Sequence, residues 1–357
     1  MAEKQKTFPA ILLRWYQFHH RKMPWRKTRD PYCIWISEIM LQQTTVQAVI
    51  PYYEKWMIRF PGLEVLARAS AQDVLKAWQG LGYYRRAKNI HKASRIFVEV
   101  YEGKIPSDYE ELRKVPGFGP YTTAAVLSIA FDLPYPAIDA NARRVWMRLS
   151  GLRKRSSPQV DQAIQKFIIP HAPNKQPGLF NQAVMELGAL VCKPKNPLCH
   201  ACPVTPFCKA FETGEQEIIP IPKKMNYRRI EAVVAIIEER GRYLIQKRPP
   251  EGLLADLWEF PGGKRKPSET LEDALRRELK EELGADVETI VRLTSVKHAY
   301  TQFRVTLHAF FCTLKHLPPL SKKRHRWVNL KGMKRYPFPS GSAKIIKFLE
   351  TMSDDKS

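Results

Sequence analysis

A dense group of cysteines constrains this chain more than any other feature of its sequence. Four of the six cysteines lie within residues 192–208, with the spacing Cys192-x6-Cys199-x2-Cys202-x5-Cys208. Two cysteines three positions apart can bind one metal centre through a tight turn, and the flanking pair completes a set of four thiolates. Four thiolates suit zinc and a [4Fe–4S] cluster about equally on chemistry alone. This loop is therefore expected to fold around a metal centre.

The chain also carries a large excess of positive charge. Its 357 residues include 59 Lys and Arg against 35 Asp and Glu, which gives a net charge of +24. Such a surface attracts polyphosphates such as nucleic acids. A solvated basic face and an anionic membrane surface are the alternative interpretations. Nucleic acid is the favoured partner class.

The chain lacks the usual signals for membranes and secretion. No apolar run reaches the roughly 18 residues that span a bilayer, and residues 1–8 have no apolar core of a secretory signal. We therefore expect a cytoplasmic protein, associated with the nucleoid of a bacterium and not with a membrane. Cysteines in that reducing compartment are expected to be ligands or thiols rather than disulfides.

The hydrophobic pattern changes after Cys208. Residues 1–211 are predicted to form an all-α domain, in which one helix follows Ser37 as N-cap and carries apolar positions from Ile39 to Tyr53. Residues 212–229 are polar, contain prolines and are predicted to be a linker. Residues 230–357 are predicted to form an α+β domain. The expected helices are 64–78, 86–101, 121–131, 139–150, 159–170, 178–191 and 269–283, and the expected strands are 231–237, 242–247 and 303–312.

A glycine-rich turn lies at residues 115–120, between two predicted helices. Gly117 and Gly119 allow the backbone N–H groups to approach a phosphate closely, and the helix that begins near Tyr121 adds its positive dipole. This is a helix-hairpin-helix, which binds the DNA backbone without reading sequence. A purely structural turn is the alternative. Asp139 follows, and in isolation it would be interpreted as a helix N-cap.

The hairpin, Asp139 and the cysteine loop, in this order, resemble the endonuclease III superfamily of DNA glycosylases. The resemblance implies that Cys192, Cys199, Cys202 and Cys208 bind a [4Fe–4S] cluster within a DNA-contacting loop at 192–208. It also implies that Val115, Gly117 and Gly119 contact DNA. Bifunctional members carry a lysine nucleophile where this chain has Tyr121, and a phenol cannot form a Schiff base. Water is therefore the expected nucleophile.

Residues 35–44 resemble the signature of the adenine DNA glycosylase (MutY) family. The resemblance implies a catalytic role for Glu38, which would otherwise be an ordinary helix acid. It further implies an adenine pocket that includes Arg21, Trp25 and Leu41, and a wedge in which Gln43 and Tyr83 enter the duplex beside the lesion. For Tyr83, core packing is the alternative.

The expected mechanism divides the chemistry between two carboxyl groups. Glu38, with its pKa raised in a dry pocket, is the general acid that protonates the leaving adenine. Asp139, kept ionised, stabilises the oxocarbenium ion or traps it covalently. Asn141 and Tyr121 orient Asp139 and the water.

In the C-terminal part, the stretch Gly263-x5-Glu269-x7-Arg277-Glu278-Leu279-x-Glu281-Glu282-x-Gly284-Ala285 resembles a complete Nudix box. Glu278, Glu281 and Glu282 fall on one helix face, where a cation such as Mg²⁺ would neutralise them. A solvated helix face is the alternative, and Mg²⁺ is expected only if the box is active. In the resembled family this domain recognises 8-oxoguanine. The family's Phe-Ser-His loop corresponds to Tyr300, Thr301 and Gln302, so that Gln302 replaces the histidine.

The sequence thus predicts a monofunctional, monomeric DNA glycosylase of the helix-hairpin-helix superfamily. Its expected substrate is double-stranded DNA in which adenine pairs with 8-oxoguanine or, more weakly, with G. Three alternatives stay open: an endonuclease III-like enzyme for damaged pyrimidines, a nucleotide pyrophosphohydrolase that uses the Nudix box, and a catalytically silent DNA-binding or iron–sulfur sensor protein.

Overall fold

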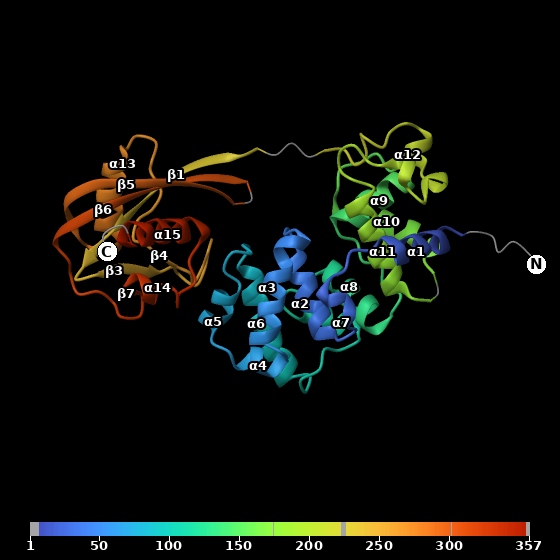
Figure 1. The fold of residues 1–357 in the computed structure, drawn as a ribbon, viewed down its shortest axis with the longest axis horizontal. Coiled ribbons are helices and arrows are strands. Elements are labelled where there is room, and N and C mark those ends of the chain that lie inside the picture. The colour runs from blue at the N-terminus through green and yellow to red at the C-terminus, as the bar shows by residue number, and fades with distance from the viewer. Residues whose placement is uncertain (1–6, 174, 223–225, 301, 355–357) are drawn as a thin grey trace, which may run out of the picture. The chain divides into compact units, whose positions relative to one another are not determined.

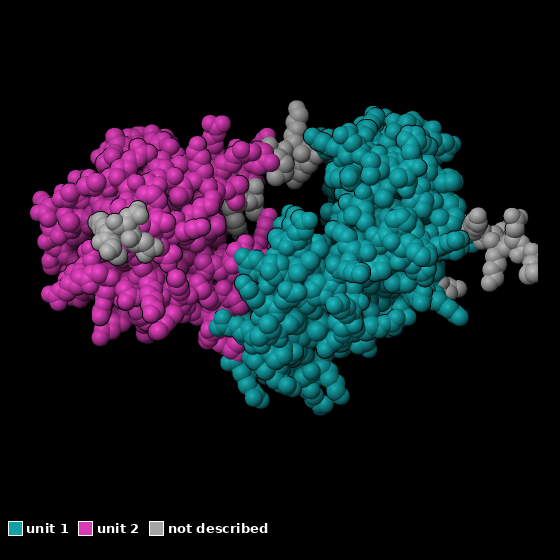
Figure 2. Space-filling model, viewed as in Figure 1, with its two compact units in different colours: residues 1–68, 89–224 teal, residues 69–88, 225–357 magenta. Residues whose placement is uncertain are grey.

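The chain divides into two compact units. The computed structural model describes residues 7–173, 175–222, 226–300 and 302–354. We call residues 1–68 and 89–224 the helical unit and residues 69–88 and 225–357 the mixed unit, teal and magenta in Figure 2. No helix within the described ranges combines the length and apolar character that crossing a membrane requires.

The helical unit consists of short helices joined by turns (Figure 1). Helix α8 packs on both α2 and α11, and α11 also packs on α1 and α9. The core between α1, α9 and α11 includes Phe8, Trp146 and Phe180, each at most 5% exposed. The elements are α1 (Phe8–His19), η1 (Pro24–Lys27), α2 (Pro31–Leu41), α3 (Val46–Arg59), α4 (Leu63–Arg68), α7 (Tyr109–Lys114), α8 (Pro120–Phe131), α9 (Ala140–Leu149), α10 (Pro158–Ile168), η2 (Ile169–His171), α11 (Pro177–Leu190), η3 (Cys199–Ala201), η4 (Thr205–Phe207) and α12 (Lys209–Glu212).

One helix start was predicted wrongly. Ser37 is not an N-cap: it is buried within α2, and its hydroxyl donates to the carbonyl of Ile34 at 2.7 Å. The helix begins seven residues earlier than predicted, because the side chain of Asp30 accepts from the backbone N–H of Tyr32 and Pro31 occupies the first position. The single helix expected through Tyr53 is in fact two, α2 and α3, separated by residues 42–45.

The mixed unit is built on two small sheets. In the first, β6 lies between β1, which is parallel to it, and β5, which is antiparallel, while in the second β3 pairs with β2, β4 and β7. Its elements are α5 (Ala71–Ala77), β1 (Arg228–Ile236), β2 (Glu238–Glu239), β3 (Arg242–Lys247), β4 (Trp258–Glu259), α13 (Leu271–Leu283), β5 (Asp286–Tyr300), β6 (Phe303–His316), β7 (His325–Val328), α14 (Leu330–Met333) and α15 (Ser340–Asp354). Helix α6 (Arg85–Glu99) begins in this unit and continues into the helical unit.

The three-stranded sheet is covered on both faces. Successive residues of β1 alternate between two cores, so that Val233 packs with α13 and Val234 packs with α15. Helix α13 begins with a capping box between Thr270 and Asp273 and ends at Gly284, whose φ is 66°. The result is an α+β layer arrangement on which the Nudix acids are displayed.

Candidate active site and DNA-binding elements

Glu38 is a buried acid on α2 and is only 6% exposed. The hydroxyl of Tyr121, near the start of α8, donates a hydrogen bond to Oε2 of Glu38. Burial raises the pKa of Glu38 from 4.5 to about 7, although the Tyr121 hydrogen bond opposes this shift. An acid with a pKa near neutrality can hold a proton and release it at physiological pH.

Asp139 lies close to this pair. It is the N-cap residue of α9, where its Oδ1 accepts from the N–H of Ala142 at 2.6 Å and its Oδ2 accepts from Nδ2 of Asn141 at 3.2 Å. Burial raises the pKa of Asp139, and these hydrogen bonds oppose the shift. After burial, the negative charge of Asp139 is a further cause that raises the pKa of Glu38 and Tyr121. The structure therefore brings the four expected catalytic residues into one electrostatic environment, with Tyr121 bonded to Glu38 and Asn141 bonded to Asp139.

Asn141 is held from two sides. Its Oδ1 accepts from Nη2 of Arg144 at 2.9 Å, and the same guanidinium donates to the carbonyls of Gly188 and Cys192 at 2.8 Å and 2.7 Å. Gly188 touches Asn141 so closely that an added Cβ would lie 2.7 Å from the Cβ of Asn141. This contact leaves no room for any larger residue at position 188 unless Asn141 moves.

The segment expected to form the adenine pocket is organised by a buried glutamate. Glu186 of α11, 1% exposed, accepts from Nε of Arg21 and from Nη2 of Arg26, both at 2.9 Å. Burial alone would raise the pKa of Glu186, but the hydrogen bonds from Arg21 and Arg26 outweigh it and lower the pKa to about 2. Trp25 is buried in η1, and Leu41 is half-buried at the end of α2.

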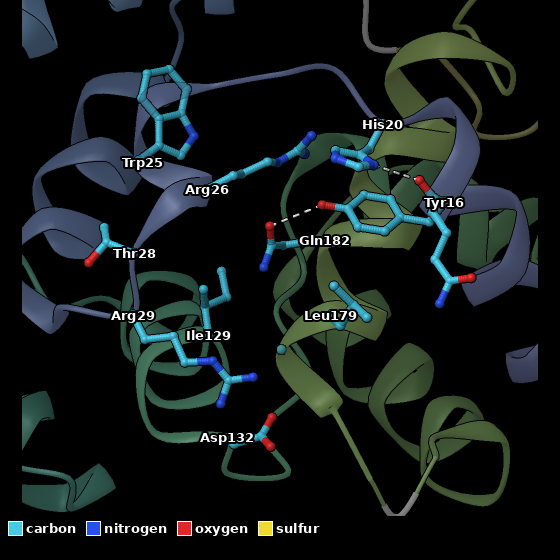
Figure 3. A pocket seen from close by; sticks show the side chains of 12 residues that line it. Tyr16, His20, Trp25, Arg26, Thr28, Arg29, Ile129, Asp132, Leu179 and Gln182 are labelled. Atoms are coloured by element: carbon cyan, nitrogen blue, oxygen red, sulfur yellow. Dashed lines mark hydrogen bonds between the residues drawn. The ribbon is translucent and has the colours of Figure 1, made fainter.

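A pocket of about 350 Å³ opens beside this segment (Figure 3). The hydroxyl of Tyr16 crosses it to Oε1 of Gln182 at 3.1 Å. Of its lining residues, Trp25 is one of the expected adenine-pocket residues, whereas Glu38 and Asp139 do not line the pocket. The two acids therefore lie outside this pocket.

The glycine-rich turn forms the expected hairpin between α7 and α8. Gly117 has a φ of 94°, a conformation that L side chains rarely adopt, and an added Cβ would lie 3.2 Å from the Cβ of Asn89. Gly119 is the N-cap of α8, and the side chain of Val115 is 4% exposed. Contacts from this turn to a phosphate would thus come from backbone N–H groups rather than from the Val115 side chain.

The two expected wedge residues share an uncommon backbone conformation. Gln43 has a φ of 59° and Tyr83 has a φ of 48°, both in the left-handed region. Non-glycine residues in this region are strained and persist only where the surrounding structure holds them in place. Such residues cluster at functional sites. Gly80 and Gly82, with φ of 109° and 71°, shape the turn that precedes Tyr83. Gln43 belongs to the helical unit and Tyr83 to the mixed unit.

The four clustered cysteines line one cavity of the helical unit, together with Arg148. Nη1 of Arg148 donates to Sγ of Cys192 at 3.2 Å. Within the described ranges no three His, Cys, Asp or Glu side chains come together tightly enough to bind a metal ion. Four thiols around a common cavity, with a cation beside them, are a donor set that fits a metal–sulfur cluster.

The acids of the Nudix box lie along α13 and have partners within the protein. Arg277 donates to Glu278 at 2.8 Å and to Glu281 at 3.2 Å. Glu282 accepts from Nε2 of Gln246 at 2.6 Å and from the backbone of residue 262 at 2.9 Å. Arg277, Gln246 and a backbone N–H thus already bind these three carboxylates.

The expected 8-oxoguanine loop is only partly visible. Thr301 and the side chain of Tyr300 lie outside the described residues. Gln302 is exposed, and its carbonyl accepts from the N–H of Arg228 at 2.8 Å.

Known proteins resemble both halves of this chain. Residues 36–170 match the HhH-GPD superfamily of base excision DNA repair proteins, and residues 232–348 match the NUDIX domain. A Buchnera aphidicola (Schizaphis graminum) protein named adenine DNA glycosylase is 33% identical over 359 residues, which cover 96% of this chain and 99% of that protein. The Homo sapiens protein of the same name is 34% identical over 88% of this chain and 68% of its own length.

The chain belongs to the adenine DNA glycosylase family.

Solved structures place this member of the adenine DNA glycosylase family among related folds. A thermostable thymine-DNA glycosylase is 28% identical, with a TM-score of 0.53, and covers 58% of this chain and 95% of its own. Endonuclease III in a non-covalent DNA complex is 23% identical, with a TM-score of 0.51, over 60% and 99% of the two chains. The predicted fold class, a helix-hairpin-helix glycosylase core followed by an α+β Nudix domain, is confirmed.

Membership in the adenine DNA glycosylase family decides between the hypotheses that the sequence left open. The family consists of base excision repair enzymes whose partner is DNA. A catalytically silent sensor, an endonuclease III-like glycosylase for damaged pyrimidines and a nucleotide pyrophosphohydrolase that uses the Nudix box are therefore disfavoured.

Within this adenine DNA glycosylase family member, sequence reasoning missed Glu186 and Gly188. Both come from α11, far along the chain from the residues that they contact. Positions two apart on a helix point to different faces, so the local pattern gave no signal that joined them.

Proposed function

We propose that this chain hydrolyses the N-glycosidic bond of adenine opposite 8-oxoguanine in double-stranded DNA, and more slowly opposite G. The observation that carries the proposal is the buried Glu38, bonded to Tyr121 and close enough to Asp139 for their charges to interact. A proton donor and an anion side by side are what departure of a nucleobase requires.

The steps follow from these groups. Glu38 gives its proton to a ring nitrogen of the flipped adenine, which turns a poor leaving group into a neutral one. The C–N bond then breaks and leaves positive charge on the sugar, which Asp139 stabilises. Water attacks the sugar carbon and gives a proton to Glu38, which lost its own in the first step, so that free adenine and an abasic site result and the acid is restored. Tyr121 and Asn141 hold the two carboxyl groups in position.

Substrate binding is assigned to the remaining elements. The hairpin at 115–119 would bind the DNA backbone, Gln43 and Tyr83 would fill the space beside the lesion, and Arg21, Trp25 and Leu41 would contribute to the adenine pocket. The loop at 300–302 would contact 8-oxoguanine. We expect the protein to act as a monomer, at the nucleoid.

The cofactor assignment rests on the donor set. Cys192, Cys199, Cys202 and Cys208 would hold a [4Fe–4S] cluster, supported by the hydrogen bond from Arg148 to Cys192. When bound, such a cluster supplies a rigid cross-link for the loop at 192–208. Mg²⁺ would belong only to a hydrolase activity of Glu278, Glu281 and Glu282, and their pairing with Arg277 and Gln246 does not favour it.

The test uses a duplex with a single A:8-oxoguanine pair under single-turnover conditions. Wild type is expected to produce strand breaks only after alkali, because it forms no imine. Glu38→Gln and Asp139→Asn are each expected to lose roughly 100-fold or more in rate. Asp132→Asn is the matched control, since Asp132 is an exposed C-cap in a left-handed conformation that asparagine also adopts. Wild-type levels of cleavage by either active-site variant would contradict the mechanism.

A further inference from the structure

The segment that carries Tyr83 is packed against the C-terminal part of the chain. Residues 69–88, which we call the wedge segment, belong to the same compact unit as residues 225–357. Nζ of Lys76 donates to the carbonyl of Tyr336 at 3.0 Å, and the buried hydroxyl of Tyr84 donates to the carbonyl of Phe338 at 3.2 Å. The wedge segment thus rests on the backbone just ahead of α15, through bonds that fix its position.

An ion-pair cluster secures the end of the same segment. Asp256 accepts from Lys88 through Oδ2 and from Lys247 through Oδ1, at 3.2 Å for the latter. The side chains of Lys88 and Asp256 are each only 25% exposed, and Lys88 also donates to the carbonyl of Pro250 at 3.2 Å. The backbone of Asp256 has a φ of 65°, so its carboxylate projects from a tightly constrained turn. Of the two lysines, only Lys88 belongs to the wedge segment.

The turn that carries Tyr83 is rigidly connected to the Lys88–Asp256 ion pair. Nη2 of Arg86 donates to the carbonyls of Leu81 and Gly82, at 3.1 Å and 3.3 Å. Its guanidinium also lies over the rings of Trp78 and Tyr83, at 5.2 Å and 5.4 Å from their centroids. Lys88 lies on α6, half a turn after Arg86. A displacement of Lys88 would therefore be transmitted to Tyr83.

We propose that Lys88 and Asp256 are positioning residues that couple the C-terminal domain to the wedge tyrosine, and so set the preference for adenine opposite 8-oxoguanine over adenine opposite G. The inference rests on the proposed function. When the C-terminal domain binds the oxidised base, the Lys88–Asp256 pair holds Tyr83 in the orientation that the lesion requires. Opposite G, that domain has no specific ligand, and the coupling contributes nothing.

The experiment compares single-turnover rates on an A:8-oxoguanine duplex and an A:G duplex, with the full chain. Lys88→Met keeps the aliphatic stem but loses the charge, and Asp256→Asn keeps the shape. Each is expected to slow the 8-oxoguanine reaction about fivefold and to leave the A:G rate within about twofold. The double variant is expected to match the single ones, because the two residues act through each other. Lys88→Arg should restore the preference.

Lys247→Met is the matched control, because it removes the other partner of Asp256 without touching the wedge segment. It should behave as wild type. A second measurement needs no DNA: hydrogen exchange at the amides of residues 81, 86 and 88 is expected to quicken in Lys88→Met and Asp256→Asn but not in Lys247→Met.

Several outcomes would overturn the inference. Equal losses of rate on both duplexes would mean that the Lys88–Asp256 pair serves only stability. An equal effect of Lys247→Met would mean that the turn around Asp256 matters and its ion pair with Lys88 does not. If the rate losses of Lys88→Met and Asp256→Asn add up in the double variant, or if hydrogen exchange at residues 81, 86 and 88 is unchanged, the proposed coupling is wrong. A wild type that cleaves neither duplex would overturn the proposed function, whereas an active wild type with unaltered preference in the variants would overturn this inference alone.

Discussion

The proposed role of Glu38 as the proton donor predicts how the rate of adenine removal depends on pH. Only the protonated acid can donate, and its pKa is raised by burial to about 7. The rate should therefore fall as pH rises through 7. At pH 9, two units higher, the protonated fraction, and with it the rate, is about one hundredth of its plateau. Burial also raises the pKa of Asp139, for which we propose an ionised role, so the rate should fall again in acid and the profile should be bell-shaped.

Removal of one hydroxyl should move the alkaline side of this profile. Tyr121 donates to Glu38 and thereby lowers its pKa against the effect of burial. A hydrogen bond to a charged group contributes about 1.5 kcal/mol, so Tyr121→Phe should raise the midpoint by roughly one pH unit. Tyr101→Phe is the matched control, since Tyr101 donates to the carboxylate of Glu111 on the surface at 2.8 Å.

The assay is single-turnover cleavage of an A:8-oxoguanine duplex between pH 5 and pH 9.5, followed by alkali. Single-turnover rates report the chemical step without product release. A profile that is flat from neutral to alkaline pH, or a midpoint that shifts downward in Tyr121→Phe, would refute the assignment of Glu38 as a buried acid held by Tyr121.

Three further changes have outcomes that the structure specifies. Glu186→Gln should destabilise the protein by about 3 kcal/mol, because it breaks a buried ion cluster; the melting temperature at pH 7 measures this. Since the pKa of Glu186 is lowered to about 2, its stabilisation should be present above pH 4.5 and lost as pH falls toward 2. Cys199→Ser should reduce bound iron and the visible absorbance, and a protein that binds zinc but no iron would contradict the cluster. Gly188→Ala should cost about 100-fold in rate by displacing Asn141, with Gly62→Ala, in open space, as control.

The local parts of the fold were predictable because they are encoded locally. Helical periodicity located most helices of the helical unit, and the capping signals around Thr270 and Gly284 agree with the helix found there. Ser37 misled because a serine before an apolar run looks like a cap, whereas the Asp30–Pro31 pair upstream is the stronger start signal. The resemblance to known signatures pointed to Glu38 and Asp139, whose catalytic roles stay predictions.

Other parts depend on contacts between distant residues, which no local pattern records. Glu186 binds Arg21, which lies 165 positions away in the sequence, and the residues around either one give no sign of the contact. The left-handed backbone at Gln43 and Tyr83 was also hidden, because side chains other than glycine seldom adopt it. The membership of residues 69–88 in the mixed unit escaped prediction for the same reason: their helical pattern is identical whichever surface they pack on.

That membership bears on how the enzyme is dissected in the laboratory. A fragment that ends at residue 211 would keep every residue assigned to the hydrolysis, yet it would strip Lys76 and Tyr84 of the carbonyls that they bond in the intact chain. Each abandoned donor costs about 1–3 kcal/mol if it stays buried, or drives a local rearrangement if it does not. Kinetic constants from such a truncation would describe an enzyme whose wedge segment has lost part of its support. Cutting the chain at the linker therefore does not yield two independent halves.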